Sequence, residues 1–462
     1  MTVQLRRTLR TSDLVLFNLV AVLSLRWMAT SAAAGPSALV LWAMAGLLFF
    51  LPLGLAVSEM TVRQPDQGGM YAWTKRAFGE GHGFIAGWCY WVNNVLYPAN
   101  LLISTAAMFT YAIGKGGSGL EANWTYVLGA TLVMLWLAVA INIVGLQAGK
   151  WLQNVGAVAT YLPGLVLVAL GVRAMLMQPP ASAFSTATMT PDLTHFAGLN
   201  LWASVAFAFT GIELASTMSE EIIEPKRAMP RAVLISAVLI AVIYVIGTLS
   251  VLWVLPSGEV NVVSGFLQSI EAASRVGGLN LVWLVPACAL LYTIGNIGGV
   301  GAWLIGPARV AFMIGIDRYL PASFGKIHPR WQTPYMAILI QAGLATLFLL
   351  LSVLGRGSTV ERAYLMLLDT MLLIYFIPFL YLFLVYMKVA GATGQPARVR
   401  ALVTGVAGFG LTLFAMIVAC IPPAGTPSVL LFELKVVGGA AAFVLVGGCY
   451  YWRGKGRLVA GC

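Results

Sequence analysis

Charged side chains are scarce in this chain: they make up 9% of its 462 residues, whereas soluble domains carry about 25%. Histidine occurs only three times, and the three copies are far apart in the sequence. The five cysteines form no C-x-x-C pair, so we expect neither disulfides nor a metal site. Neither an H-E-x-x-H motif nor a cluster of paired carboxylates occurs. The sequence therefore argues against an enzyme and calls for no cofactor.

Hydrophobic residues, by contrast, make up 60% of the chain, and the mean hydropathy is +0.88. A helix needs about 20 apolar residues to cross a bilayer. Apolar runs of about that length occur near residues 12–34, 38–61, 83–114, 123–146, 151–176, 197–219, 230–255, 280–315, 334–354, 361–388, 399–421 and 428–452. The sequence thus predicts an all-α polytopic membrane protein with 12 transmembrane helices, in one domain that spans residues 1–462.

The basic residues lie at the ends of these runs, which argues against nucleic-acid binding despite the net charge of +11. With twelve spans, 20 of the 27 lysines and arginines fall on the side of the termini and 6 on the other side. The positive-inside rule then places both termini in the cytoplasm and the protein in the cell inner (plasma) membrane. Arg6, Arg7 and Arg10 before an apolar run resemble a signal peptide, but Arg26 interrupts that run, so we expect an uncleaved first span.

Two of the apolar runs contain features that disfavour a continuous, lipid-facing helix. The sixth contains Gly211 and Glu213, and a carboxylate at membrane depth costs roughly 2.5–3.5 kcal/mol on insertion scales. The first contains Arg26 within Ser24–Trp27. These positions open two successive sets of five spans, and paired interrupted helices in the two halves of a transporter indicate its substrate site.

Other polar residues within the runs are Asn93, Asn94 and Asn100 in the third, Asn296 in the eighth and Asp369 in the tenth. Asn93 and Asn94 are adjacent, so they point to different helix faces and at most one of them faces a cavity. We interpret Asp369 as a packing or gating residue.

Several motifs resemble those of the amino acid–polyamine–organocation (APC) superfamily, and some are closest to its glutamate/GABA antiporter branch. They are Gln67–Trp73 with Ala77–Gly79, Phe207–Glu213, Glu224–Arg227 with Pro230, Trp303–Arg309 with Arg318–Pro321 and Thr333–Pro334, and Ile421–Pro423.

This resemblance implies a LeuT-type fold with broken first and sixth helices. Two inverted five-helix repeats, about 12–176 and 197–388, would be followed by two extra helices at about 399–452. In relatives, backbone N–H groups at the first break hold the substrate carboxylate, and carbonyl groups at the sixth hold its amine. An aromatic before the sixth-span glycine occludes the pocket. The substrate-binding residues implied here are Ser24, Leu25, Arg26, Trp27, Tyr90, Phe207, Thr210, Gly211, Glu213 and Trp303.

Arg26 departs from the family pattern, because many relatives have a Gly-Ser-Gly stretch where this chain has Ser24, Leu25 and Arg26. Its fixed positive charge could pair with Glu213, bind a substrate carboxylate or replace a coupling cation; a purely structural role is the alternative. Glu213 is in turn a candidate proton carrier, and the alternative is a permanent ion pair or hydrogen-bond acceptor that latches the sixth helix.

The leading hypothesis is a secondary active amino acid transporter, either an antiporter or a proton-coupled symporter. An arginine in the pocket favours neutral or acidic amino acids. The alternatives are a carrier of cationic amino acids or polyamines, and a membrane sensor that binds amino acids without transport. The expected partners are an amino acid and the lipid bilayer, and the sequence leaves the oligomeric state open.

Overall fold

The computed structural model describes residues 8–65, 68–116, 118–144, 146–191, 203–278, 280–354, 360–391, 395–422 and 428–460. Within these ranges the regular structure is helical, and the only strand-like pairing is an isolated parallel bridge between Leu9 and Ile222.

The helices differ widely in length, from one turn to more than thirty residues. In chain order they are α1 (Thr11–Val22), α2 (Arg26–Ala32), α3 (Ser37–Ala45), α4 (Leu51–Arg63), α5 (Met70–Phe78), α6 (Glu80–Ala112), α7 (Trp124–Ile143), α8 (Leu146–Met177), α9 (Thr186–Met189), α11 (Pro225–Val254), α12 (Gly265–Arg275), α13 (Leu284–Ile316), α14 (Tyr335–Leu354), α15 (Val360–Ala390), α16 (Gln395–Ala419) and α17 (Val429–Ala460). Residues 203–208 are also helical.

Among the described residues, nine helical segments are long and apolar enough to cross a membrane, and the bent pair α1–α2 makes a tenth. α3 and α4 form one of the nine, joined by a π-helical turn at Gly46–Phe50. The apolar part of α14, Tyr335–Leu350, is shorter. The predicted run at 197–219 lies partly outside the described residues. The protein is therefore an all-helical, multi-pass membrane protein across the part that the structure describes.

The first span is interrupted at residues 23–25, and its axis bends by 42° between α1 and α2. Leu23 ends α1 in an extended conformation, with φ −73° and ψ 100°. L-amino acids adopt this conformation without strain. The break therefore forms without a glycine.

The second interruption follows the helical residues 203–208 and ends in a 3-10 segment, Leu214–Glu221. Gly211 lies within it and has a φ of +116°. A Cβ atom at this position would lie 3.1 Å from the Trp303 ring and 3.2 Å from the Ala21 carbonyl oxygen. Both the backbone conformation and the space therefore require glycine here.

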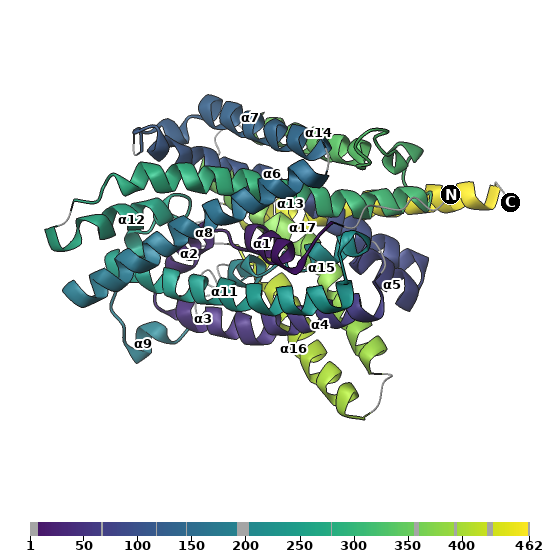
Figure 1. Ribbon diagram of the computed structural model, residues 1–462, viewed down its shortest axis with the longest axis horizontal. Coiled ribbons are helices and arrows are strands. Elements are labelled where there is room, and N and C mark those ends of the chain that lie inside the picture. The colour runs from purple at the N-terminus through teal and green to yellow at the C-terminus, as the bar shows by residue number, and fades with distance from the viewer. Residues whose placement is uncertain are drawn as a thin grey trace.

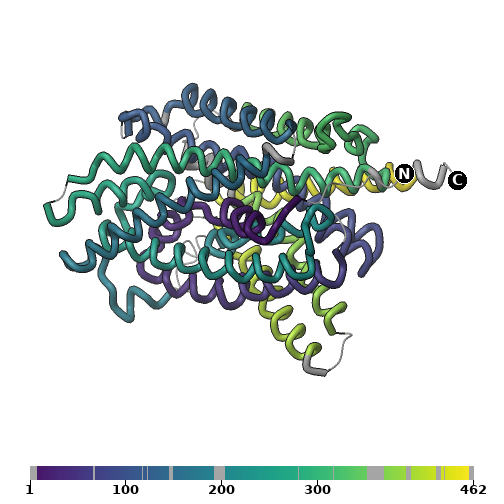
Figure 2. Tube along the Cα trace, in the orientation of Figure 1, coloured from purple at the N-terminus to yellow at the C-terminus, as the bar shows by residue number. Residues whose placement is uncertain are grey.

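Figures 1 and 2 show α1 and α2 near the middle of the bundle, and α1 packs against α8, α11 and α13. α5 lies at one end of the molecule, whereas α9 and α12 lie at the opposite end (Figure 1). The first break thus lies inside the bundle, away from either end.

Glycines bring α8 and α13 into direct backbone contact. A Cβ on Gly156 would lie 2.8 Å from the Cα of Gly298, and a Cβ on Gly298 would lie 2.8 Å from the Cα of Gly156. One turn away, a Cβ on Gly295 would overlap the Thr160 side chain. Small residues of this kind allow close helix packing in membranes, where the hydrophobic effect does not drive helices together.

We expect Gly298→Val to push α13 away from α8 and to destabilise the protein by about 1–3 kcal/mol, the usual cost of overpacking. Thermal unfolding in detergent measures this loss. Gly129→Val on α7 is the matched control, since a Cβ there meets nothing within 4 Å. Equal melting temperatures for the two variants would show that the α8–α13 contact is not tight.

Candidate functional site

The two helix breaks leave backbone groups without helical partners, and two aromatic side chains satisfy several of them. Trp303 of α13 donates its indole N–H to the Ala21 carbonyl at 2.8 Å. The Tyr244 hydroxyl of α11 accepts from the Ser24 N–H at 3.1 Å and lies 2.6 Å from the Val22 carbonyl oxygen. In a bilayer such groups must be satisfied by protein or trapped water. These two side chains therefore stabilise the first break.

Tyr244 also reaches the second break, because its hydroxyl lies 3.2 Å from the Ala208 carbonyl oxygen. Its ring stacks on Trp42 at a centroid distance of 4.5 Å, and both rings are buried. One side chain from a third helix thus joins both interruptions, and α11 holds them in a fixed relation.

Buried aromatic rings gather beside the breaks. Phe207 packs edge-on against Trp27 at 5.9 Å and against Tyr375 at 5.7 Å. Tyr97 lies 4.3 Å from Trp303 and 6.4 Å from Phe207, measured between ring centroids. We call Trp27, Tyr97, Phe207, Trp303 and Tyr375 the aromatic cluster. It joins residues of α2, α6, α13 and α15 to the segment before Gly211.

Arg26 is fully buried, with 0% of its surface exposed. Its Nη1 donates to Oδ1 of Asn100 on α6 at 2.7 Å. The guanidinium carbon lies 4.5 Å from the centroid of the Trp27 ring and 5.7 Å from that of Tyr97. A desolvated cation over aromatic faces gains about 2 kcal/mol, so the aromatic cluster helps to hold this charge within the membrane.

Glu213 is equally buried and accepts hydrogen bonds from three donors. Its Oε2 accepts from the Gly211 N–H at 2.8 Å, and its Oε1 from the Tyr375 hydroxyl at 2.5 Å and the Tyr90 hydroxyl at 3.4 Å. Across the described residues, no ion pair joins Glu213 to Arg26. The carboxylate instead connects the second break to α6 and α15.

A buried ion pair lies beyond Glu213. Arg309 of α13 binds Glu221 with two hydrogen bonds, one of them 2.8 Å from Nη2 to Oε2, and both side chains are buried. The backbone N–H groups of Thr8 and Leu9 donate to the Glu221 carbonyl at 2.9 and 3.1 Å. Glu221, at the end of the 3-10 segment, thereby connects α13 to the segment before α1.

At the same end, α5 is fixed to the end of α13. Lys75 donates to Asp317 at 2.7 Å, and the Tyr71 hydroxyl also donates to this carboxylate. Burial and then the hydrogen bond to Asp317 raise the pKa of the Tyr71 phenol. Tyr71 therefore stays protonated and keeps donating.

The amino acid permease family matches this sequence over residues 9–432. The chain belongs to that family. The resemblance of its motifs to the APC superfamily is thereby confirmed, and the protein is a transporter rather than an enzyme.

Three transporters are similar in sequence to this permease over most of their length. An uncharacterized transporter of Legionella pneumophila is 31% identical over 458 residues, which cover 96% of both chains. A probable agmatine/putrescine antiporter of Lactococcus lactis is 24% identical over 90% of this chain and 88% of its own. A glutamate/gamma-aminobutyrate antiporter of the same species is 24% identical over 82% and 77%.

The structure brings the ten residues named from the sequence to the two breaks of the permease. Ser24 and Leu25 lie in the first break, and Arg26 and Trp27 begin α2. Thr210 and Gly211 lie in the second, where the Thr210 hydroxyl donates to the Phe207 carbonyl at 2.7 Å. The contacts given above place the other four, Tyr90, Phe207, Glu213 and Trp303, around these segments.

Sequence reasoning missed three tyrosines of this region: Tyr97, Tyr244 and Tyr375. Tyr97 follows Tyr90 by seven residues, which places both on one helix face, so this spacing could have revealed it. Tyr244 is the one tyrosine of its apolar run, and Tyr375 is one of four in its run. Their sequence neighbours give no sign of the partners they meet.

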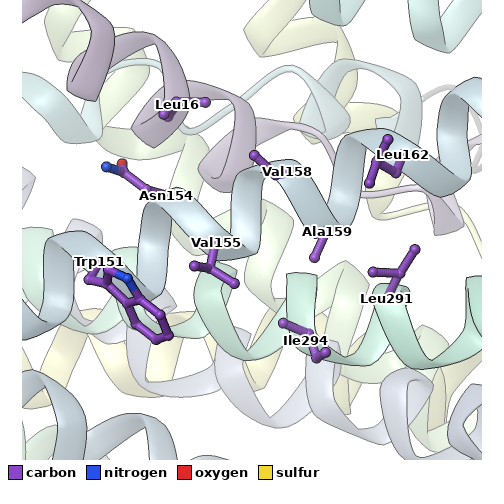
Figure 3. Close-up of a pocket in the computed structure, with 9 residues that line it drawn as sticks. All are labelled: Leu16, Trp151, Asn154, Val155, Val158, Ala159, Leu162, Leu291 and Ile294. Carbon is purple, nitrogen blue, oxygen red and sulfur yellow. The ribbon is translucent and has the colours of Figure 1, made fainter.

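A groove of about 400 Å³ lies outside this region, on α8 between α1 and α13 (Figure 3). Apart from Asn154, it is lined by apolar side chains such as Leu16, Val158 and Leu291. Trp151 at its edge is 68% exposed, as is usual for a surface that faces lipid. The groove therefore belongs to the outer face of the permease and not to its site.

We expect Tyr244→Phe to reduce transport about tenfold, because the loss of a buried hydrogen-bonding group costs roughly 1–3 kcal/mol and both breaks lose their link. Uptake into proteoliposomes measures this effect. Tyr126→Phe is the matched control, because the Tyr126 hydroxyl donates to a backbone carbonyl, that of Ala106, far from the breaks. Equal transport by the two variants would contradict the role of Tyr244.

Proposed function

We propose that this permease is a secondary active transporter of amino acids that works by alternating access, as an antiporter or with protons. The observation that carries the proposal is the meeting of two interrupted helices, joined by Tyr244 and bordered by the aromatic cluster. Interrupted helices are the usual place for a substrate in transporters. The printed names of the relatives, antiporters of glutamate/gamma-aminobutyrate and of agmatine/putrescine, support exchange.

For the topology, we propose twelve spans in the LeuT-type arrangement. Two inverted repeats at about 12–176 and 197–388 precede two extra helices at about 399–452, and both termini are cytoplasmic. The alternation of connections supports this: α5, with Lys75 and Arg76, lies at one end, and α9 and α12 lie at the other (Figure 1). The basic end is cytoplasmic by the positive-inside rule, and the protein lies in the inner (plasma) membrane.

The substrate would bind between Ser24–Trp27 and Thr210–Glu213, with its carboxylate on the first break and its amine on the second. Arg26 adds a fixed cation beside this place. A cationic substrate would meet repulsion from Arg26, so we propose neutral or acidic amino acids. This argues against the alternative of a polyamine or cationic amino acid carrier.

In this topology, two closures flank the substrate. Phe207 precedes the second break and would close the outer side with Trp27. Glu213 with Tyr90 and Tyr375 would close the inner side, backed by the pair Glu221–Arg309. Rocking of the broken helices would open one side at a time, because Phe207 precedes the second break and Glu213 follows it.

Counterflow of a panel of amino acids in proteoliposomes tests the function. We expect the wild type to exchange neutral or acidic amino acids and to exclude arginine and putrescine. Arg26→Ala should lose the preference for acidic substrates by about tenfold or more, since charge-assisted hydrogen bonds contribute roughly 1.5–3 kcal/mol.

Arg26→Lys is the control for this series, because it keeps the charge but not the planar guanidinium. We expect it to retain part of the preference for acidic substrates. Unchanged selectivity in Arg26→Ala would remove Arg26 from the site. Binding without any flux in the wild type would instead identify a sensor.

We also propose that Glu213 couples transport to protons. Protonation would remove acceptor capacity from the carboxylate and release the tyrosines that close the inner side. Glu213→Gln, which keeps the size but cannot titrate, should therefore retain exchange and lose uptake driven by a pH gradient. Gradient-driven uptake and exchange measured on the same vesicles check this, and retention of both in Glu213→Gln would assign Glu213 a latching role alone.

A further inference from the structure

Asn93 of α6 is a buried amide that the interactions described above do not use. It is 0% exposed, and both its Nδ2 and its Oδ1 lack a hydrogen-bond partner in the structure. Burying an unsatisfied amide costs roughly 1–3 kcal/mol. A side chain in this situation points to a partner that binds there.

The register of α6 places Asn93 on the face that looks towards the breaks. Tyr90, three residues earlier, reaches Glu213, and Tyr97, four residues later, packs on Trp303 and Phe207. Asn100, seven residues later, binds Arg26. Residues three, four and seven apart share a helix face, so Asn93 lies between side chains that all contact the site.

The neighbouring Asn94 is partly satisfied within its own helix, although its Oδ1 also lacks a partner. Its Nδ2 donates to the Tyr90 carbonyl of its own helix at 2.6 Å. Its backbone carbonyl accepts from Gln341 of α14 at 2.9 Å. The Asn94 amide is thus satisfied at one of its two polar groups, whereas Asn93 is satisfied at neither and shares its helix face with Asn100, which binds Arg26.

We propose that Asn93 contacts the side chain of the transported amino acid and selects side chains that end in a carboxylate or a carboxamide. This inference rests on the proposed amino acid transport. An amide offers one donor group and one acceptor, so it pairs with either end group. An aliphatic side chain leaves both atoms buried without partners, and sites built for hydrogen bonds reject such analogues strongly. Arg26 on the same side excludes cationic end groups.

Aspartate, asparagine and leucine provide the test, because their side chains have the same branched shape and differ in the end group. Counterflow competition gives the preference of the wild type for aspartate or asparagine over leucine. We expect this preference to be at least tenfold, and Asn93→Leu to reduce it at least tenfold.

The matched control is Asn142→Leu on α7. Asn142 is also fully buried, its Oδ1 also lacks a partner, and it packs against Gly149 and Gly301 away from the breaks. We expect this variant to keep the wild-type preference. The same fall in preference in both variants would mean that any buried asparagine produces it, and would overturn the proposal.

Asn93→Asp gives a second measurement that does not depend on the folding of Asn93→Leu. The added negative charge should weaken aspartate at least tenfold relative to asparagine. If a folded Asn93→Leu exchanges leucine and aspartate in the wild-type ratio, or if Asn93→Asp leaves the aspartate-to-asparagine ratio unchanged, Asn93 does not contact the side chain. A wild type that exchanges no amino acid would overturn the proposed function itself, so the two failures are distinguishable.

Discussion

Hydrogen bonding of the interrupted backbone is the constraint on which the centre of this molecule depends. A continuous helix satisfies its own N–H and C=O groups within a membrane, whereas a broken helix exposes them. Trp303 donates to the Ala21 carbonyl, and the Tyr244 hydroxyl accepts from the Ser24 N–H and lies within hydrogen-bond distance of the Val22 and Ala208 carbonyl oxygens. Each comes from a different helix, so the breaks hold their shape only while α11 and α13 stay packed against them.

Among the described residues, the opposite charges Arg26 and Glu213 lie in one bundle without pairing with each other. Arg26 is held by Asn100 and by the faces of Trp27 and Tyr97, and Glu213 by hydroxyl and backbone donors. A direct ion pair would neutralise both groups, whereas here each group is stabilised by partners of its own. The protein stabilises each charge separately, and buried aromatic side chains supply part of this stabilisation for both.

The sequence was informative where a residue is costly in a membrane helix and uninformative where it is not. Gly211, Glu213 and Arg26 stand out against an apolar background, and that contrast located both breaks. Leu23 ends α1 with an allowed extended conformation, so no residue type marks that end. Tyr244 and Tyr375 are ordinary tyrosines until the packing of distant helices gives their hydroxyl groups partners. The predicted number of spans stays a prediction, because the run at 197–219 lies partly outside the described residues.

The ion pair Glu221–Arg309 couples the second break to the segment that precedes α1. A buried ion pair contributes little net stability, because desolvation of both charges offsets their attraction, but separation of its partners is expensive. Such a pair therefore adds little to the stability of the arrangement in which it is formed, but it disfavours intermediate arrangements in which its charges are separated and buried. Because Thr8 and Leu9 bind the backbone of Glu221, any movement that parts Glu221 from Arg309 also moves the segment that leads into α1. These backbone hydrogen bonds thus link the end of the second break directly to the start of the first broken helix. The link does not pass through the residues of the site.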